Sequence, residues 1–518
     1  MDQTYVLGID VGTQGLKAAM YTAEGVRVWV GSASYATRYP RPGVSEQEPR
    51  DWWKALVRVL QSCVDSESLA KVSAVTVCAT SSTVLVVDAE GEPVSPGMMW
   101  MDTRAGVEAD AMNAIGDPAV QRVMRYSGGK ASAEWMTPKS LWIKNNGWMR
   151  PGYKIVEQLD WMNYRLTGRW TASRCNATCK WNYTPEGFSD TFFRAIGFEE
   201  YAEWWPTDVL AVGERVGGIV PSAAAETGLK AGVPVFQGGI DAHIGMLGIG
   251  ATGVGDMSMI TGTSFVHLVH TREAVFEPGL WGPYADAILP DSWLLEGGQL
   301  TCGSLTSWYV EQFYPGADKS LMDNIYKEIL DEARRIEPGS DGLVMMDSWQ
   351  GNRTPYRNPW MKGTLFGLTM SHTRHHIFRA ILESVAYGTN HIIKTFERSG
   401  VGIRRVVASG GGVKNELWMQ IIADVTGIPI DIAQESEAGT KGCAVIGAYG
   451  LGLYGSLREA SARMTSVERQ YAPDPMRQQA YRDMYETYIQ LNERLMPLME
   501  KAIPASKRCE GVAECNLS

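Results

Sequence analysis

Several features of other protein classes are missing from this 518-residue chain. None of its 8 cysteines form a Cys-x-x-Cys pair, so neither a zinc ribbon nor a thioredoxin-type motif is expected. No run approaches the ~18 consecutive apolar residues of a membrane helix, and the start does not resemble a secretory signal. Basic residues are outnumbered, 48 against 58 acidic ones, which gives a net charge of −10. These absences argue against nucleic-acid and membrane partners and favour a cytoplasmic protein.

Two cysteines, Cys175 and Cys179, lie four residues apart. Two thiols alone do not complete a tetrahedral metal site, so we expect reduced structural thiols here rather than metal ligands. A chain of this length buries a large core without disulfide or metal cross-links.

Glycine, in contrast, is abundant, with 55 residues in 518, about one in nine against a usual ~7%. Residues 5–11 predict a buried strand, which a glycine turn joins to a second strand at residues 16–21. Residues 257–260 and 265–269 repeat this strand–turn–strand pattern. A single repeat after ~250 residues indicates two domains of like topology, because solenoids repeat every 20–50 residues.

We therefore expect an α/β protein with a first domain at 1–250, a second at 251–503 and a flexible tail at 504–518. Glycines crowd between residues 245 and 255, which predicts a hinge there. Apolar residues at helical spacing predict helices at 51–63 (with Asp51 as N-cap), 376–397, 415–426, 442–449 and 478–501.

The first glycine turn carries an acidic residue at the end of its leading strand. The segment runs Gly8-x-Asp10-x-Gly12-Thr13-Gln14-Gly15. Backbone N–H groups of such turns can face a phosphate, and a carboxylate beside a phosphate requires a cation between them. The pattern fits a nucleotide–Mg2+ site, and an ordinary tight hairpin fits it equally well.

Two further glycine segments could contact a nucleotide. The turn Thr261-Gly262-Thr263-Ser264 matches the first one by position, so the two can face each other across a polyphosphate. The segment Ser409-Gly410-Gly411-Gly412, with Asn415 after it, lets the backbone approach a flat ligand such as a purine. It matches neither Gly-x-Gly-x-x-Gly nor the Walker A motif, which argues against dinucleotide-binding and P-loop folds.

Asp241 follows a glycine pair, Gly238-Gly239, at the end of a predicted strand. This position places a carboxylate in a cleft with little side-chain cover, where it can accept a proton from an attacking hydroxyl. A helix N-cap is the alternative interpretation. His243 is expected to be structural.

Polar and aromatic residues elsewhere predict a polyol site, because sugars are bound by polar groups against apolar walls. The candidates are Ser81, Ser82, Thr83, Trp100, Asp102, Arg104, Cys179, Lys180, Trp181, Glu296 and Gln299. Asp102 and Arg104 could equally form a surface ion pair.

Together these residues resemble the FGGY carbohydrate kinases from about residue 5 to about residue 480. Gly363-x-Leu365-x-Gly367-Leu368, with residues 376–383, is similar to the second family signature, and residues 137–146 are similar to the first. The resemblance implies two actin-like (ribonuclease H-like) domains with a cleft between them, ATP and Mg2+ as cofactors, and a small-molecule sugar or polyol as substrate. Dimers are frequent among such proteins, so a homodimer is a further expectation.

The resemblance also implies residue roles by position. Asp241 would be the catalytic base and a metal neighbour, and Asp10 would hold Mg2+ through water. The first phosphate loop would comprise Asp10, Gly12, Thr13, Gln14 and Lys17, and the second Thr261, Gly262 and Thr263. The adenosine site would comprise Gly410, Gly411, Gly412 and Asn415. The sugar site would comprise Ser81, Ser82, Trp100, Asp102, Arg104, Lys180, Asp241 and Glu296.

Within the family, residues 78–82, 179–183, 282–284, 296–299 and 351–355 look more like ribulokinases and their pentulose or polyol relatives than like glycerol kinases. Ser81-Ser82 departs from the Cys-Ser often found there. The expected activity is ATP-dependent phosphorylation of a terminal hydroxyl of ribulose, then xylulose, then a tetritol or pentitol. An actin- or chaperone-like switch ATPase and a non-catalytic sugar sensor are the alternatives from other classes.

Overall fold

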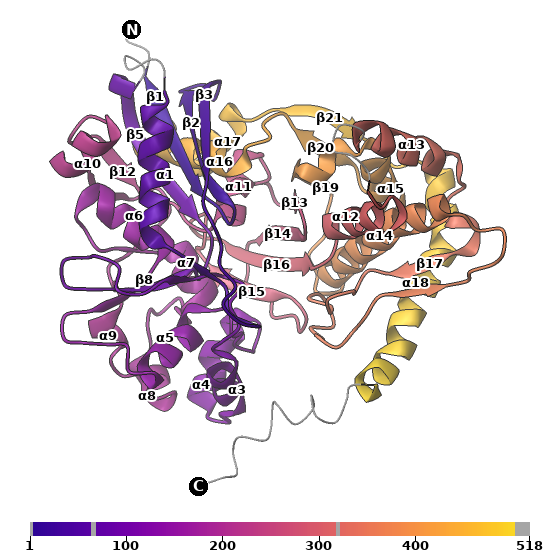
Figure 1. The fold of residues 1–518 in the computed structure, drawn as a ribbon, viewed down its shortest axis with the longest axis horizontal. Coiled ribbons are helices and arrows are strands. Elements are labelled where there is room, and N and C mark those ends of the chain that lie inside the picture. Colours follow the sequence, from indigo (N-terminus) through magenta and orange to yellow (C-terminus); the bar gives the residue numbers. More distant parts are fainter. Residues whose placement is uncertain (1–3, 64–68, 317–321, 503–518) are drawn as a thin grey trace.

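The computed structural model describes residues 4–63, 69–316 and 322–502. Two lobes, each built around a β-sheet, lie side by side (Figure 1). Most of the first half of the chain forms one lobe and most of the second half forms the other. The tail predicted at 504–518 lies outside the described residues. Within the described ranges, no helix has the length and apolar character needed to cross a membrane.

The two central sheets share a local arrangement. In the first sheet, β1 pairs antiparallel with β2 and parallel with β5. In the second, β13 pairs antiparallel with β14 and parallel with β19. The first sheet runs β11 (Arg215–Gly218), β12 (Pro234–Phe236), β5 (Val72–Ala79), β1 (Tyr5–Val11), β2 (Gly15–Thr22), β3 (Arg27–Ser34). The second runs β15 (Trp281–Ala285), β16 (Trp293–Gln299), β14 (Phe265–Thr271), β13 (Asp256–Thr261), β19 (Arg405–Gly410), β20 (Ile430–Ala433), β21 (Val467–Tyr471). The predicted α/β class and the repeated strand–turn–strand pattern are confirmed.

Helices cover both sheets, and short strands form smaller sheets beside them. The helices of the first half are α1 (Pro49–Gln61), α3 (Gly106–Ala114), α4 (Pro118–Met124), α5 (Met136–Asn145), α6 (Gln158–Thr167), α7 (Arg174–Lys180), α8 (Asp190–Ala195), α9 (Tyr201–Trp204), α10 (Pro221–Thr227) and α11 (Asp241–Gly248). Those of the second half are α12 (Gly303–Phe313), α13 (Met322–Arg335), α14 (Arg374–Arg398), α15 (Glu416–Thr426), α16 (Ala438–Gly450), α17 (Leu457–Met464) and α18 (Pro475–Lys501). The smaller sheets use β4 (Glu46–Gln47), β7 (Gly97–Met98), β6 (Val84–Val87) and β8 (Lys154–Glu157); β9 (Ala172–Ser173) and β10 (Val209–Leu210); and β17 (Val344–Met346) and β18 (Thr364–Phe366).

Helix ends follow capping chemistry, with one difference from the sequence prediction. The Asn415 side chain caps α15 by accepting from the N–H of Trp418, and Gly427 ends that helix in the left-handed region. Helix α1, however, begins at Pro49 with Glu48 as its N-cap, so the prediction of Asp51 as N-cap is wrong. Proline fits the first helical position because its missing N–H would have no intrahelical partner there.

Helix α16 comes from the second half of the chain, but it packs on strand β1 of the first sheet and on helix α11. Its glycines permit a very close approach: a Cβ on Gly442 would lie 2.0 Å from the carbonyl oxygen of Ile244. A Cβ on Gly248 in α11 would likewise lie 2.1 Å from the carbonyl oxygen of Ala438. Gly245 and Gly248 therefore lie in a packed helix rather than in the flexible crossover that their crowding predicts.

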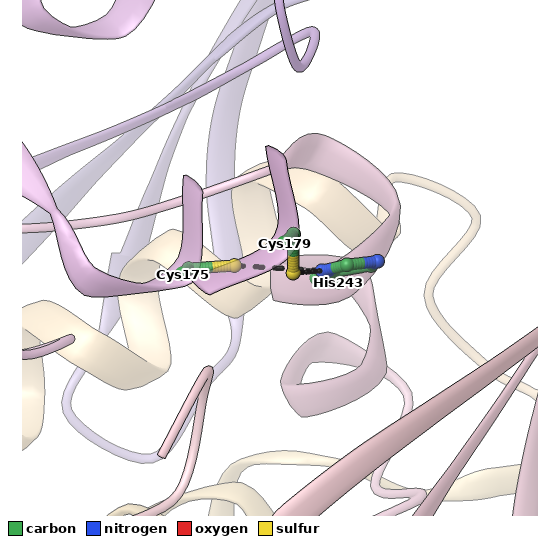
Figure 2. A group of neighbouring side chains, drawn as sticks. All are labelled: Cys175, Cys179 and His243. Carbon is green, nitrogen blue, oxygen red and sulfur yellow. Dashed lines mark hydrogen bonds between the residues drawn. The ribbon is translucent and has the colours of Figure 1, made fainter. Parts of the chain in front are cut away.

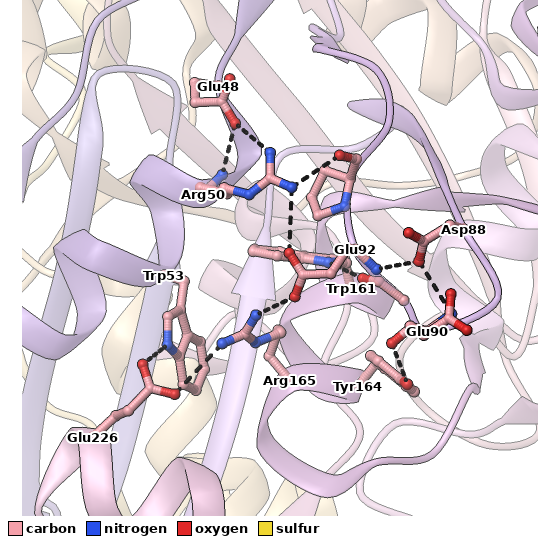
Figure 3. A network of polar contacts seen from close by, with 12 residues as sticks. Glu48, Arg50, Trp53, Asp88, Glu90, Glu92, Trp161, Tyr164, Arg165 and Glu226 are labelled. Carbon is pink, nitrogen blue, oxygen red and sulfur yellow. Dashed lines mark hydrogen bonds and ion pairs between the residues drawn. The ribbon is translucent and has the colours of Figure 1, made fainter.

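The outer face of the first lobe carries a polar network between α1, α6, α10 and the loop at 88–92 (Figure 3). Arg165 contacts Glu92 at 3.1 Å and Glu226 at 3.5 Å, and the Trp53 indole donates to Glu226 at 2.8 Å. The Arg165 guanidinium also lies over the Trp53 ring. Single exposed ion pairs contribute little, but this network joins three helices on the face opposite α16.

Candidate active site

A cavity of about 190 Å³ is lined by residues from both lobes. Among the predicted site residues, those that line it are Thr13, Ser81, Ser82, Trp100, Lys180, Asp241 and Glu296. The other described lining residues are Thr80, Glu134, Trp135, Ile240, Ala242, His243, Ser264, Val266 and Arg353. Strand ends, helix starts and loops that lie up to more than 300 positions apart in the sequence therefore meet at one place.

Two partly buried carboxylates lie at one edge of the site: Asp241 lines the cavity, and Asp10 interacts with it electrostatically. Asp10 lies near the end of β1, and Asp241 is the first residue of α11, after the N-cap Ile240. Asp241 is therefore not the N-cap that one interpretation of the sequence predicts. Burial and the negative charge of Asp241 raise the pKa of Asp10 to about 7, and burial raises the pKa of Asp241 to about 6.

Oδ1 of Asp10 is buried and has no hydrogen-bond partner among the described residues. An unpartnered, buried carboxylate oxygen near a second, partly buried carboxylate is costly without a cation, because both negative charges lose solvation. Oxygen-only donors with room for water suit Mg2+. The residues present at this edge therefore fit a hydrated divalent cation.

The hairpin turn between β1 and β2 is held by hydrogen bonds from Trp100 and Gln47. The N–H of Gly12 donates to the carbonyl of Gly15 at 3.1 Å, which closes the turn. The Trp100 indole donates to Oγ1 of Thr13 at 3.0 Å, and the Gln47 amide donates to the Thr13 carbonyl at 2.8 Å. Gln14 is exposed at the tip, and Lys17 extends from β2 to Glu437 at 2.7 Å.

The second turn, Thr261–Thr263, lies against the Gly410–Gly412 segment. Thr261 Oγ1 donates to the carbonyl of Ser409 at 2.8 Å and accepts from the N–H of Gly412 at 3.0 Å. Gly410 has φ +103°, and a Cβ there would lie 2.1 Å from the Thr261 carbonyl oxygen, so a side chain does not fit. The two glycine segments predicted to contact the nucleotide are thus joined directly. Gly262 and Gly411, in contrast, have open space where a side chain would be. An added Cβ would lie 3.7 Å from the nearest atom at Gly262, and at Gly411 no atom lies within 4 Å.

Glu296 is the centre of a buried charge cluster on the opposite wall. Its carboxylate lies 3.8 Å from Lys180 Nζ, 3.4 Å from His243 Nε2 and 3.9 Å from an Arg353 nitrogen. Burial opposes ionisation, but Lys180, His243 and Arg353 hold the pKa of Glu296 well below its usual range. These contacts are longer than direct hydrogen bonds, so the charged groups keep capacity for a polar ligand.

Aromatic rings surround the Lys180 ammonium on this wall. Its Nζ lies 5.4 Å from the Trp135 ring centre and 5.6 Å from that of Trp281. The ammonium therefore lies over aromatic rings and also faces Glu296, and polar groups set against aromatic walls are the arrangement expected of a polyol pocket.

Asp102 and Arg104 are not among the described residues that line the cavity. Arg104 contacts the Asp102 carboxylate through Nε at 2.8 Å and Nη2 at 2.7 Å, and it also reaches Glu46 at 2.7 Å. Asp102 accepts from the N–H of Ser45 at 2.8 Å. The pair is buried rather than a surface pair, and it fixes the loop that carries Trp100.

The sequence analysis did not single out Lys139, Glu157 or Arg353. Lys139 is fully buried in α5 and donates to the carbonyls of Ser82 at 2.7 Å and Met99 at 2.6 Å. Glu157 accepts from the N–H of Ser82, whose φ of +55° is unusual for a non-glycine residue. Lys139 and Arg353 lie within residues 137–146 and 351–355, which the family resemblance covers, but the local sequence around neither residue assigns it to the site.

Family models match almost the whole described chain. The N-terminal domain of the FGGY family of carbohydrate kinases matches residues 5–248, and the C-terminal domain matches residues 257–451. This chain belongs to the FGGY family of carbohydrate kinases. It is an enzyme of the sugar-kinase type, and family members use ATP, typically with a divalent metal.

Individual relatives agree with this family assignment. An FGGY carbohydrate kinase domain-containing protein of Xenopus laevis is 31% identical, over 95% of this chain and 96% of its own. A ribulokinase of Bacillus licheniformis is 31% identical, over 86% of each chain. The solved structure of a ligand-bound xylulose kinase from Lactobacillus acidophilus has a TM-score of 0.86 at 19% identity, covering 96% of this FGGY chain and 99% of its own. The fold is therefore that of two actin-like domains.

Proposed function

We propose that this FGGY kinase transfers the terminal phosphoryl group of ATP to a terminal hydroxyl of a ketopentose, ribulose first and xylulose second. The observation that carries the proposal is the pairing, in one cavity, of Asp241 with the Glu296–Lys180–Arg353 cluster. A substrate rich in hydroxyls can bind the charged wall while one hydroxyl faces the Asp241 carboxylate, which lines the same cavity. The ribulokinase of Bacillus licheniformis supports the choice of sugar by its similarity. A tetritol or pentitol is the second candidate.

Asp241 is proposed as the general base, accepting the proton of the sugar hydroxyl as its oxygen attacks in line. Burial raises the pKa of this carboxyl to about 6, so it is a stronger base than an exposed aspartate and still ionised at neutral pH. Asp10 and Asp241 would hold Mg2+, with Asp10 acting through water, and the cation would neutralise charge on the phosphates.

The glycine turns are proposed to bind the nucleotide. Backbone N–H groups at Thr13 and Gln14 would contact phosphate from one side, and that of Thr263 from the other, because the N–H groups of Gly12 and Gly262 already close their turns onto Gly15 and Ser264. Lys17 would reach the same phosphates after leaving Glu437. The Gly410–Gly412 segment and Asn415 would lie along the adenosine, although the Asn415 side-chain oxygen already caps α15.

A switch ATPase would use the same turns without a sugar, and a sugar sensor would lack the catalytic carboxylates. Asp10 and Asp241 are both present, and Glu296, Lys180 and Arg353 line the same cavity as Asp241. We further propose that the enzyme acts in the cytoplasm as a homodimer; light scattering of the purified protein measures the second point.

The test is an ADP-release assay with MgATP against pentuloses, pentitols, tetritols and glycerol. We expect turnover on one or two ketopentoses, a loss of ~10³-fold or more in kcat with Asp241→Asn, and no change with Asp208→Asn, whose side chain is exposed. Turnover on polyols alone would change the substrate and keep the mechanism. Equal ATP hydrolysis with and without sugar, unaffected by Asp241→Asn, would establish a switch ATPase instead.

A further inference from the structure

Beneath the sugar-facing wall, two cysteines and a histidine converge (Figure 2). Cys175 and Cys179 lie one turn apart on α7, so both thiols project from the same helix face. Nδ1 of His243, on α11, lies 3.4 Å from Sγ of Cys175 and 3.7 Å from Sγ of Cys179. All three donor atoms lie within 4.8 Å of one another, and all three residues are buried.

This geometry is that of a preformed soft-metal site. Zinc binds cysteine sulfur at about 2.3 Å and histidine nitrogen at about 2.0–2.1 Å, so a tetrahedral ion places its sulfur and nitrogen ligands about 3.6 Å apart. The two observed sulfur–nitrogen distances, 3.4 and 3.7 Å, lie on either side of that value. We propose that Cys175, Cys179 and His243 bind one Zn2+-class cation, with a water as the fourth ligand. The expectation of purely structural thiols did not include the histidine, which lies over sixty residues away in the sequence.

The surroundings of His243 support a ligand role. Its second ring nitrogen, Nε2, lies 3.4 Å from the Glu296 carboxylate. Metal-binding histidines usually direct their other N–H to a carboxylate, which fixes the tautomer and the ring orientation. Here the Glu296 carboxylate already lies on the Nε2 side of the ring, so the orientation needed for Nδ1 coordination exists before any metal arrives.

The backbone is also shaped around the cluster. Gly239 lies so close to Cys175 that a Cβ there would be 2.7 Å from Cys175 Cβ and 2.9 Å from its sulfur. Glycine at this position lets the strand end approach α7. Two thiolates and one divalent cation form a neutral unit, so burying it introduces no net charge. His243 lines the cavity, which gives an ion a route inward.

The sulfur and nitrogen donors of this site distinguish it from the pair of carboxylates, Asp10 and Asp241, at the edge of the cavity. Thiolates select Zn2+ and its congeners, whereas Mg2+ requires oxygen donors. The proposed ion would join α7 to α11 directly behind Glu296 and Lys180, and so hold the wall of the cavity in place. This structural role would hold for whichever sugar the enzyme uses.

The experiment titrates metal-free, reduced, full-length protein with Co2+ and then displaces it with Zn2+. We expect one Co2+ per chain, with thiolate-to-metal absorption in the near ultraviolet and the visible bands of tetrahedral cobalt, both removed by Zn2+. Cys175→Ser and Cys179→Ser should each abolish these bands, whereas Cys63→Ser, a buried cysteine in a different part of the core, should leave them unchanged. Glu296→Gln should weaken the affinity by about 10-fold.

A second measurement uses only the wild-type chain, so it does not depend on the folding of any variant. Zn2+ should protect Cys175 and Cys179, identified by peptide mass, from alkylation during partial unfolding, and it should raise the melting temperature. Three results would overturn the proposal. The cobalt–thiolate bands could be absent, or they could persist in the Cys175→Ser/Cys179→Ser double variant. A mass loss of 2 Da could also show a Cys175–Cys179 disulfide in place of metal binding. None of these readouts involves phosphoryl transfer, so they remain decisive if the proposed sugar activity fails.

Discussion

At the scale of single residues, the site contains charged side chains that lie close together but too far apart for short hydrogen bonds. Glu296 lies 3.4–3.9 Å from three cationic or titratable partners and is itself part of the cavity wall. We expect Glu296→Gln to raise the KM for sugar by about 10- to 100-fold, because hydrogen bonds to charged groups contribute about 1.5–3 kcal/mol. The KM for ATP should stay within twofold.

Steady-state kinetics in both substrates check this prediction, with the exposed Glu186→Gln as the matched control. Equal increases in the KM for ATP and for sugar would contradict it, because Glu296 would then support the whole cleft rather than the sugar wall.

Lys139 provides a second residue-scale prediction. Its ammonium joins the Ser82 and Met99 carbonyls in a fully buried position. Lys139→Met keeps the volume but leaves both acceptors unpaired, and it removes a positive charge that interacts with Asp102, Glu134 and Glu157. We expect the free energy of unfolding to fall by about 2–4 kcal/mol, measured by urea denaturation; an unchanged midpoint would contradict the assigned role.

The same lysine predicts a pH dependence of stability. Burial lowers the pKa of Lys139 to about 8 from 10.5. Between these values the unfolded chain binds the proton and the folded chain does not, so folding stability rises with pH. The difference in unfolding free energy between wild type and Lys139→Met should therefore increase from pH 8 to pH 10.5. A flat difference across paired denaturation curves would show that the amine titrates normally.

At the scale of elements, the sequence carried most information where structure is local. The hairpins at 5–22 and 256–271 follow from apolar strands around a glycine turn, and α15 follows from Asn415 and Gly427. The hinge prediction was wrong at Gly245 and Gly248. Closely spaced glycines give the same sequence signal whether they make a segment flexible or allow two helices to pack closely. Arg353 and Lys139 act through tertiary contacts, for which a single sequence has no spacing rule.

Helix α16 shows what such glycines contribute. Gly442→Ala would place a Cβ 2.0 Å from the Ile244 carbonyl, so α11, which begins with Asp241, would have to move. We expect a loss of about 1–3 kcal/mol in stability together with a fall in kcat. Gly106→Ala is the control, since that helical glycine has no neighbour within 4 Å of an added Cβ. Thermal denaturation and initial rates on both variants measure the effects, and equal behaviour of the two would refute close packing.

At the scale of the whole molecule, the cavity requires both lobes. Asp241, Trp100 and Lys180 come from the first half of the chain, whereas Glu296 and Arg353 come from the second. The two halves of the chain also meet where α16 packs on the first sheet and at the Lys17–Glu437 and Arg27–Glu435 ion pairs at the margin. The margin pairs are partly exposed, so they can exchange partners at little cost.

A kinase with such a cleft has to exclude water, because water competes with the sugar hydroxyl for the phosphoryl group. Binding sugar and nucleotide together should draw the lobes closer, since each ligand is proposed to contact residues of both. We therefore expect the radius of gyration from solution scattering to decrease only when sugar, Mg2+ and a non-hydrolysable ATP analogue are all present. Asp208→Asn should behave like wild type, and Glu296→Gln should need more sugar for the same decrease. Superimposable scattering profiles with and without saturating ligands would mean that the cleft is already closed, and water would then have to be excluded by the bound sugar itself.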